Sequence, residues 1–121
     1  MLVRVLIADD SALMRGAVRR VLTGEPGIEI VGEACNVGEM IEMRERFAPD
    51  IVIMDLYMAE ESRMPASELS SSESRLLAIS ASDPEEGGQK AREIGASAFL
   101  DKLCLHTTLI PKIFELCKAS S

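Results

Sequence analysis

Polar residues stand at the ends of several short apolar runs, and together their types are suited to phosphoryl chemistry. The run "VLIA" leads into Asp9 and Asp10, "IVIMD" ends in Asp55, and two later runs end in Ser80 and Lys102. Three carboxylates brought close together repel one another unless a cation lies among them. Carboxylate oxygens suit Mg²⁺, and a carboxylate can accept a phosphoryl group as an acyl phosphate. Asp55 is therefore the candidate nucleophile, with Lys102 and Ser80 as candidate contacts of the transferred group.

Each of these residues also has an ordinary structural explanation. Asp9, Asp10 or Ser11 can cap the helix that follows them. Asp55 can begin a turn, and Lys102 can be a solvated surface lysine. Taken singly, each position favours the ordinary explanation. Their joint order, with each group directly after an apolar run, favours one shared site.

The apolar runs themselves predict the strands of a parallel sheet. They are nearly continuous in hydrophobicity and rich in β-branched residues, which is typical of strands covered on both faces. Segments of helical spacing alternate with them, so a three-layer α/β domain is expected. Ligands of such a sheet bind outside the carboxyl ends of the strands, where the polar residues meet if the first and third strands are neighbours. The predicted strands are residues 2–8, 28–34, 51–56, 75–80 and 97–102.

Two later segments predict helices with unusual features. In "DPEEGGQKAREIG", Asp83 is the expected N-cap and Gly95 the stop, and the pair Gly87-Gly88 should weaken the helix by roughly 1 kcal/mol per glycine relative to alanine. An apolar stripe over residues 109–117 predicts the last helix, in which Pro111 is tolerable only in the first turn. His106 is expected near the start of that helix.

Residues 59–74, "AEESRMPASELSSSES", are predicted to be an irregular or degenerate crossover. Met64 and Leu69 are its only apolar residues besides alanine, so any helix is expected to be short, near 65–70, and poorly anchored. If this stretch were instead a linker, residues 75–121 would form a second domain too small to bury its own apolar runs. One domain over residues 1–121 is therefore expected.

Composition limits the partners of the chain. Its 13 Lys and Arg against 20 Asp and Glu give a net charge of -7, which argues against direct binding of nucleic acid or an anionic membrane. Cys35, Cys104 and Cys117 have no metal-ligand spacing and are expected to be buried free thiols in a reducing cytoplasm. No secretory leader or apolar run of about 20 residues is present, so a cytoplasmic protein is expected. The terminal "ASS" fits either a natural end or the beginning of a linker.

Four blocks of the sequence resemble the receiver domains of bacterial two-component response regulators. The resemblance covers essentially all 121 residues. It implies a flavodoxin-like, doubly wound sheet of five parallel strands in the order 2-1-3-4-5, here with the third helix short or missing. The blocks are "VLIADDSALMR" (5–15), "PDIVIMDLYM" (49–58), "LLAISAS" (76–82) and "AFLDK" (98–102).

The resemblance implies a role for each candidate of the acidic site. Asp55 is expected to be the phosphoacceptor, with Lys102 pairing with its phosphoryl group. Asp10 is expected to ligate Mg²⁺ directly and Asp9 partly through water. The backbone carbonyl of Tyr57 is expected to complete the protein's share of the metal site.

The resemblance also implies a switch and partners. Ser80 matches the switch hydroxyl and Phe99 the aromatic that reorients with it. The output surface is expected on the helix after Asp83, the strand at Phe99 and the last helix. A sensor histidine kinase is the expected donor, with a C-terminal DNA-binding domain beyond this chain and a phosphorylation-dependent homodimer as further partners. Leu103, where many members have a cis-proline, fits regulators of transcription with a helix-turn-helix output domain.

An active receiver domain is one of several functions that these residues could serve. A receiver catalyses only its own phosphorylation and dephosphorylation, so the chain is not expected to be an enzyme. The altered stretch after Met58 supports the alternative of a degenerate receiver that acts only in interaction or dimerisation. An aspartyl phosphatase is disfavoured because Tyr57 stands where a second carboxylate is usual. A flavin-binding module is disfavoured because "ADDSALM" is acidic where a phosphate loop is needed.

Overall fold

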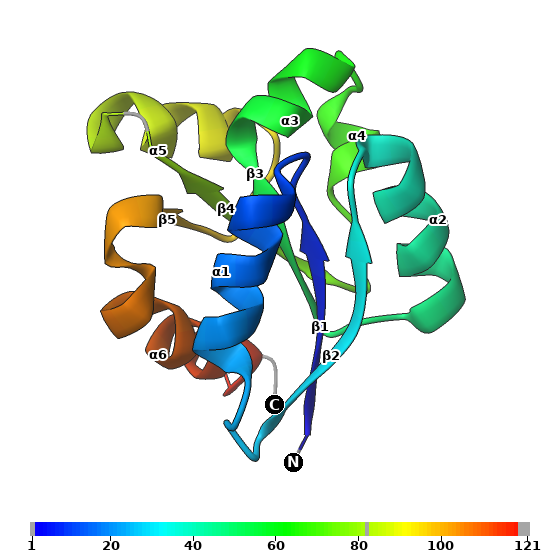
Figure 1. The fold of residues 1–121 in the computed structure, drawn as a ribbon. Helices are drawn as coiled ribbons and strands as arrows, with labels where there is room; N and C mark the ends of the chain where they lie inside the picture. The colour runs from blue at the N-terminus through cyan, green and yellow to red at the C-terminus, as the bar shows by residue number, and fades with distance from the viewer. Residues whose placement is uncertain (1, 82, 119–121) are drawn as a thin grey trace.

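Five parallel strands form one sheet with helices on both of its faces (Figure 1). The computed structural model describes residues 2–81 and 83–118, so the terminal residues 119–121 lie outside it. In chain order the elements are β1 (Val3–Ala8), α1 (Ala12–Leu22), β2 (Ile28–Ala34), α2 (Val37–Phe47), β3 (Ile51–Asp55), α3 (Leu56–Ser62), α4 (Ala66–Leu69), β4 (Arg75–Ser80), α5 (Pro84–Glu93), β5 (Ala98–Asp101), the 3₁₀ helix η1 (Lys102–Cys104) and α6 (Leu105–Lys118).

The strand order is β2-β1-β3-β4-β5, which confirms the predicted doubly wound topology. β1 and β3 are direct neighbours at the centre of the sheet. From β1 the chain continues to β2 on one side, and from β3 it continues to β4 and β5 on the other. Ala8 of β1 pairs with Met54 of β3, Asp55 pairs with Ile79, and Ser80 pairs with Asp101. The carboxyl ends of β1, β3, β4 and β5 are thus level with one another, where open α/β sheets bind ligands.

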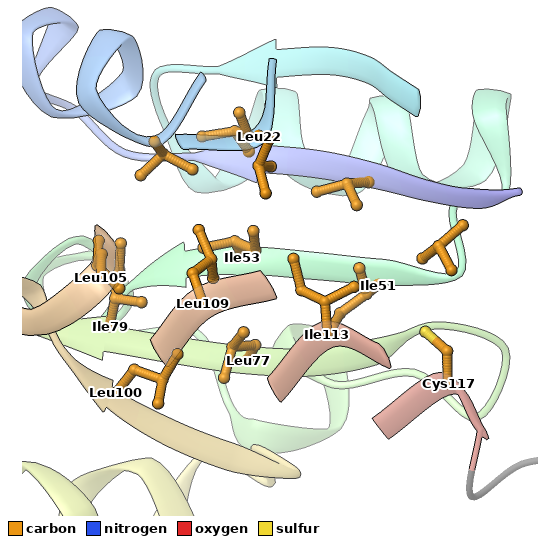
Figure 2. Close-up of a cluster of buried hydrophobic side chains, with 14 residues drawn as sticks. Leu22, Ile51, Ile53, Leu77, Ile79, Leu100, Leu105, Leu109, Ile113 and Cys117 are labelled. Carbon is orange, nitrogen blue, oxygen red and sulfur yellow. The ribbon is translucent and has the colours of Figure 1, made fainter. Parts of the chain in front are cut away.

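One face of the sheet is covered by α1 and α6. In Figure 2 the apolar side chains of α6 lie over those of the central strands. Because the strands carry branched residues that alternate between the faces, this cluster takes every second side chain of β1, β3 and β4. The labelled members are Leu22, Ile51, Ile53, Leu77, Ile79, Leu100, Leu105, Leu109, Ile113 and Cys117.

The other face is covered by α2, α3, α4 and α5. Met40 of α2 and Leu69 of α4 are fully buried there against Val52 and Met54 of β3. Leu6 and Ala8 of β1 and Leu76 of β4 join this second cluster, and Ala78 of β4 packs in a small third cluster with Leu56 and Ala91. Both faces of the sheet are therefore apolar and covered.

The crossover from β3 to β4 contains two short helices and an unexpected anchor. The predicted helix near 65–70 is confirmed as α4, but α3 begins directly after Asp55, where no helix was predicted. The expectation of poor anchoring is wrong, because Met58 and Leu69 are buried while Met64 is exposed. Arg44 of α2 adds a polar tie by donating hydrogen bonds to the carbonyl oxygens of Glu68 and Leu69.

The structure differs from the sequence-based expectations at Pro111, Cys35 and Cys104. The last helix starts at Leu105 and contains His106 in its first turn, so Pro111 lies inside the helix rather than in its first turn. An internal proline costs about 3 kcal/mol, but each large apolar side chain that α6 buries contributes roughly 1.5–3 kcal/mol. Cys117 is buried as expected, whereas Cys35 and Cys104 are exposed because they lie in loop and 3₁₀ segments at the sheet's carboxyl end.

The helix from Asp83 forms as predicted. The Asp83 carboxylate accepts a hydrogen bond from the Glu85 N–H, and Gly95 follows the helix with a φ of +82°. A positive φ strains any residue with a Cβ, so glycine suits this stop. None of the helices within residues 2–81 and 83–118 combines the length and the apolar composition that a membrane span requires.

Replacement of Leu69 by alanine tests the anchoring of the crossover. The change removes a fully buried side chain from the second cluster, so we expect the free energy of unfolding to fall by roughly 2–5 kcal/mol. Met64→Ala, on the same crossover but 37% exposed, should change it by less than about 0.5 kcal/mol. Urea unfolding followed by circular dichroism measures both. Equal, small losses in the two variants would show that α4 does not anchor the crossover.

Candidate functional site

Asp9 is held rigidly at the end of β1. It is 1% exposed, and its backbone N–H donates to the Ala34 carbonyl of β2 at 3.0 Å. Its Oδ1 accepts a hydrogen bond from the Ser11 N–H at 2.9 Å, and its own carbonyl accepts one from the Arg15 guanidinium at 2.7 Å. Ser11 in turn caps α1 by accepting from the Met14 N–H. Backbone, side chain and the start of α1 together fix this carboxylate.

Asp55 ends β3 and begins α3. Its side chain is almost completely buried, and its Oδ2 accepts a hydrogen bond from the Met58 N–H at 2.9 Å. This bond makes Asp55 the N-cap of α3 and satisfies one of the helix's first free N–H groups. Its Oδ1 lies 2.8 Å from Nζ of Lys102. One oxygen of the Asp55 carboxylate therefore caps α3, and the other contacts the Lys102 ammonium.

Lys102 follows β5 directly and places its ammonium group between two carboxylates. Nζ lies 2.8 Å from Oδ1 of Asp55 and 3.1 Å from Oδ2 of Asp9. Burial alone lowers the pKa of the Lys102 ammonium, but the hydrogen bond and charge of Asp55 and the nearby charge of Asp9 outweigh burial, so the pKa is raised overall. The side chain is therefore a fixed positive charge at neutral pH.

The acidic residues gather more negative charge than Lys102 neutralises. Asp9, Asp10 and Asp55 each offer a carboxylate oxygen, and these oxygens lie within 4.8 Å of one another. Asp10 is exposed, whereas Oδ2 of Asp9 is buried and has no hydrogen-bond donor among the described residues. The Lys102 ammonium attracts this oxygen by charge from 3.1 Å. Such an arrangement of oxygen ligands fits a small divalent cation.

Ser80 and Phe99 differ in burial, although they lie on the adjacent strands β4 and β5. Ser80 is buried at the end of β4, one residue beyond the partner of Asp55 in the sheet. Phe99 is half-buried on β5 in register with Ala78, and its ring packs against α5 rather than among the carboxylates. The switch pair expected from the sequence therefore lies on adjacent strands.

Tyr57 stands in the first turn of α3, with an exposed side chain. The negative charge of Glu61 is the main cause that raises the pKa of its hydroxyl, with a smaller contribution from Asp10. Helical carbonyls point along the axis toward the C-terminal end. The expected role of the Tyr57 carbonyl as a metal ligand stays a prediction.

Two residues that support the site were not singled out from the sequence. Arg15 lies within the block 5–15 without a predicted role, yet it binds the Asp9 carbonyl and lies 3.7 Å from the Glu33 carboxylate of β2. Met58 supports the site by donating its backbone N–H to the Asp55 carboxylate, a contact that does not depend on the type of its side chain. Only the position of Arg15, one helical turn after the capping Ser11, would have indicated that it faces the end of β1.

Residues 5–114 match the family model of the response regulator receiver domain. The chain belongs to this family. The match covers all the elements that build the acidic site, from β1 to most of α6.

Individual relatives agree with this membership. Over 112 residues, or 91% of the chain, the sequence is 39% identical to the transcriptional regulatory protein PdtaR of Mycobacterium tuberculosis, of which it covers 54%. It is 53% identical over 55 residues to a protein-glutamate methylesterase/protein-glutamine glutaminase of Methanosarcina acetivorans, covering 46% of this chain and 16% of that protein. The match therefore spans from about a sixth to about half of the length of these relatives.

Solved receiver structures share the fold closely. The signal receiver domain of the response regulator NarL from Mycobacterium tuberculosis superposes with a TM-score of 0.83 at 28% identity, covering 97% of both chains. A LuxR-family two-component response regulator from Aurantimonas gives a TM-score of 0.82 at 25% identity, covering 98% of this chain and 87% of that one.

Replacement of Lys102 by glutamine tests the central ion pair. The change leaves the buried carboxylates of Asp9 and Asp55 without their cation, so in metal-free buffer we expect the free energy of unfolding to fall by roughly 3 kcal/mol. Lys112→Gln, whose partner Glu115 is exposed, should cost less than about 1 kcal/mol. Chemical unfolding with a chelator present measures both. If the two variants lose equally little, Lys102 is a solvated lysine and the site is not built around it.

Proposed function

We propose that this receiver domain carries its phosphoryl group on Asp55 and receives it from a phosphohistidine of a sensor kinase in the cytoplasm. The observation that carries the proposal is the Lys102 ammonium, held 2.8 Å from Asp55 in a site that also contains Asp9. A buried nucleophile beside a fixed positive charge is what the transfer of an anionic group requires.

The transfer forms one bond and breaks one bond. An oxygen of the Asp55 carboxylate attacks phosphorus, the P–N bond of the phosphohistidine breaks, and the imidazole leaves with the bonding electron pair. The product is an acyl phosphate on Asp55. Lys102 then pairs with a phosphoryl oxygen, and we assign a second contact to the hydroxyl of Ser80, which is buried at the end of β4.

Mg²⁺ is the proposed cofactor, with Asp10 as a direct ligand, Asp9 partly through water, and Asp55 and the Tyr57 carbonyl completing the set. The buried Oδ2 of Asp9, without a hydrogen-bond donor among the described residues, supports this assignment. When bound, Mg²⁺ neutralises charge on the carboxylates and on the incoming phosphoryl group. Asp9 is held in place by hydrogen bonds that the Ser11 N–H donates to its Oδ1 and the Arg15 guanidinium donates to its carbonyl oxygen.

The proposed output surface is formed by α5, β5 and α6, reached through Ser80 and Phe99. Phosphorylation shifts a two-state equilibrium of this surface. Because the chain corresponds to only part of its relatives, we assign DNA contact to a helix-turn-helix domain outside these 121 residues, and homodimerisation to the phosphorylated state. The net charge of -7 supports the absence of a direct nucleic-acid contact here.

Incubation with acetyl phosphate and Mg²⁺ tests the phosphoacceptor. We expect intact-protein mass spectrometry to show the addition of a single phosphoryl group, because Asp55 is the carboxylate nearest the Lys102 ammonium, at 2.8 Å against 3.1 Å for Asp9. Asp55→Asn should abolish the addition. Asp83→Asn is the matched control, since asparagine caps a helix as well as aspartate does. Persistence of the label in Asp55→Asn, or its absence from the unaltered protein, contradicts the proposal and favours the degenerate receiver that acts only through interactions.

Mg²⁺ should stabilise the folded domain, because the ion binds the native carboxylate cluster. At a free concentration about ten times Kd we expect a gain of about 1.4 kcal/mol in unfolding free energy. Tyr57, the only tyrosine in a chain without tryptophan, provides a fluorescence signal beside the site. Asp10→Asn should remove most of the gain, and Glu45→Gln on the exposed side of α2 should leave it unchanged. An equal gain in all three proteins would show that the ion acts nonspecifically.

A further inference from the structure

Gly87 of α5 leaves a space that the ring of Phe99 occupies. A Cβ atom placed on Gly87 would lie 2.5 Å from Cζ and 2.7 Å from Cε1 of that ring. Carbon atoms that are not bonded do not approach so closely, since their contact optimum is about 3.5–4.0 Å. The ring therefore rests directly on the backbone of the helix, and Gly87 is buried beneath it.

The neighbouring Gly88 has no such role. A Cβ atom on Gly88 would meet only Nη1 of Arg92, at an ordinary contact distance of 3.7 Å. The sequence presents both glycines as equal weak points of one helix, because both lower helix propensity alike. Close packing of the Phe99 ring explains why residue 87 is glycine, but no such contact explains the glycine at position 88.

The position of the ring connects the phosphoacceptor strand with the output surface. Phe99 packs against the small cluster of Leu56, Ala78 and Ala91. Leu56 directly follows Asp55, and Ala78 lies two residues before Ser80 on β4. We call this cluster, together with the Gly87 backbone, the Phe99 seat. A ring held there contacts the residue that follows the predicted phosphoacceptor and a residue two positions before the predicted switch hydroxyl.

We propose that Gly87 is a positioning residue that holds Phe99 in the resting state of the receiver, so that filling its space moves the domain toward the phosphate-favoured state. The inference rests on the proposed function and adds its regulation. A Cβ raises the free energy of the conformation in which the ring occupies the Phe99 seat and Asp55 is unmodified. Rotation of one side chain relieves the overlap more easily than movement of the α5 backbone, because the atoms that collide belong to the far end of Phe99.

The first experiment follows the ring itself, without phosphate or metal. We expect Gly87→Ala to change the NMR ring signals of Phe99 and to remove its ring-current shift from the Leu56 and Ala91 methyl groups. Gly88→Ala, which gains the same helix propensity, should leave these signals in place. If the two variants give the same spectra for these groups, or if both retain the wild-type shifts, Gly87 does not position Phe99 and the inference is overturned.

The second experiment follows the switch. Titration with Mg²⁺ and beryllium fluoride, which mimics the phosphoryl group, should give an apparent Kd at least about fivefold lower for Gly87→Ala than for the unaltered protein. Gly88→Ala should show no change. In a Phe99→Leu background the effect of Gly87→Ala should disappear, because the colliding ring is gone. This double variant also separates a regulatory effect from a general disturbance of α5.

Each outcome of the titration decides the question. An unchanged or higher Kd for Gly87→Ala, or an effect that survives in Phe99→Leu, overturns the regulatory role of Gly87. If the unaltered protein itself fails to bind beryllium fluoride, the proposed function is contradicted and the regulatory role falls with it. The NMR comparison in metal-free protein then still shows whether Gly87 positions the ring, so the two failures are distinguishable.

Discussion

The contact of the Lys102 ammonium with Asp55 and Asp9 is the interaction on which the rest of the site depends. Each of these groups is costly to bury alone, and each becomes stable only in the presence of the others. The contact requires β1 and β3 to be neighbours and β5 to end level with them, which the strand order provides. The sheet topology, the covered faces and the short 3₁₀ helix after β5 all serve to bring these three side chains together.

Asp55 also caps α3 and so connects the acidic site with the crossover from β3 to β4. Its Oδ2 caps α3, and α3 is tied to α5 by the contact of Glu60 with Lys90 at 3.2 Å. That surface ion pair is weak by itself. However, α3 is also anchored by Met58, so a change at Asp55 acts on an element that is packed against the sheet and against α5. The crossover, despite its polar sequence, is therefore part of the site's surroundings.

The sequence predicted the strands, their polar ends and the joint site, because parallel strands align their carboxyl ends and because few other patterns place acid pair, aspartate, serine and lysine in that order. It did not predict α3, since the burial of Met58 depends on tertiary packing in the second cluster rather than on local periodicity. The role of Gly87 was also hidden, because only the approach of Phe99 distinguishes it from Gly88. Pro111 was misplaced because tertiary burial of α6 outweighs the local cost of a proline.

The proposed site of the acyl phosphate is Asp55 itself. Treatment of the phosphorylated protein with borohydride reduces an aspartyl phosphate to homoserine, and peptide mass spectrometry then locates the converted residue. We expect conversion at Asp55 alone, and none when Asp55 is replaced by asparagine. Conversion at Asp9 or Asp10, or at a residue away from Lys102, would contradict it.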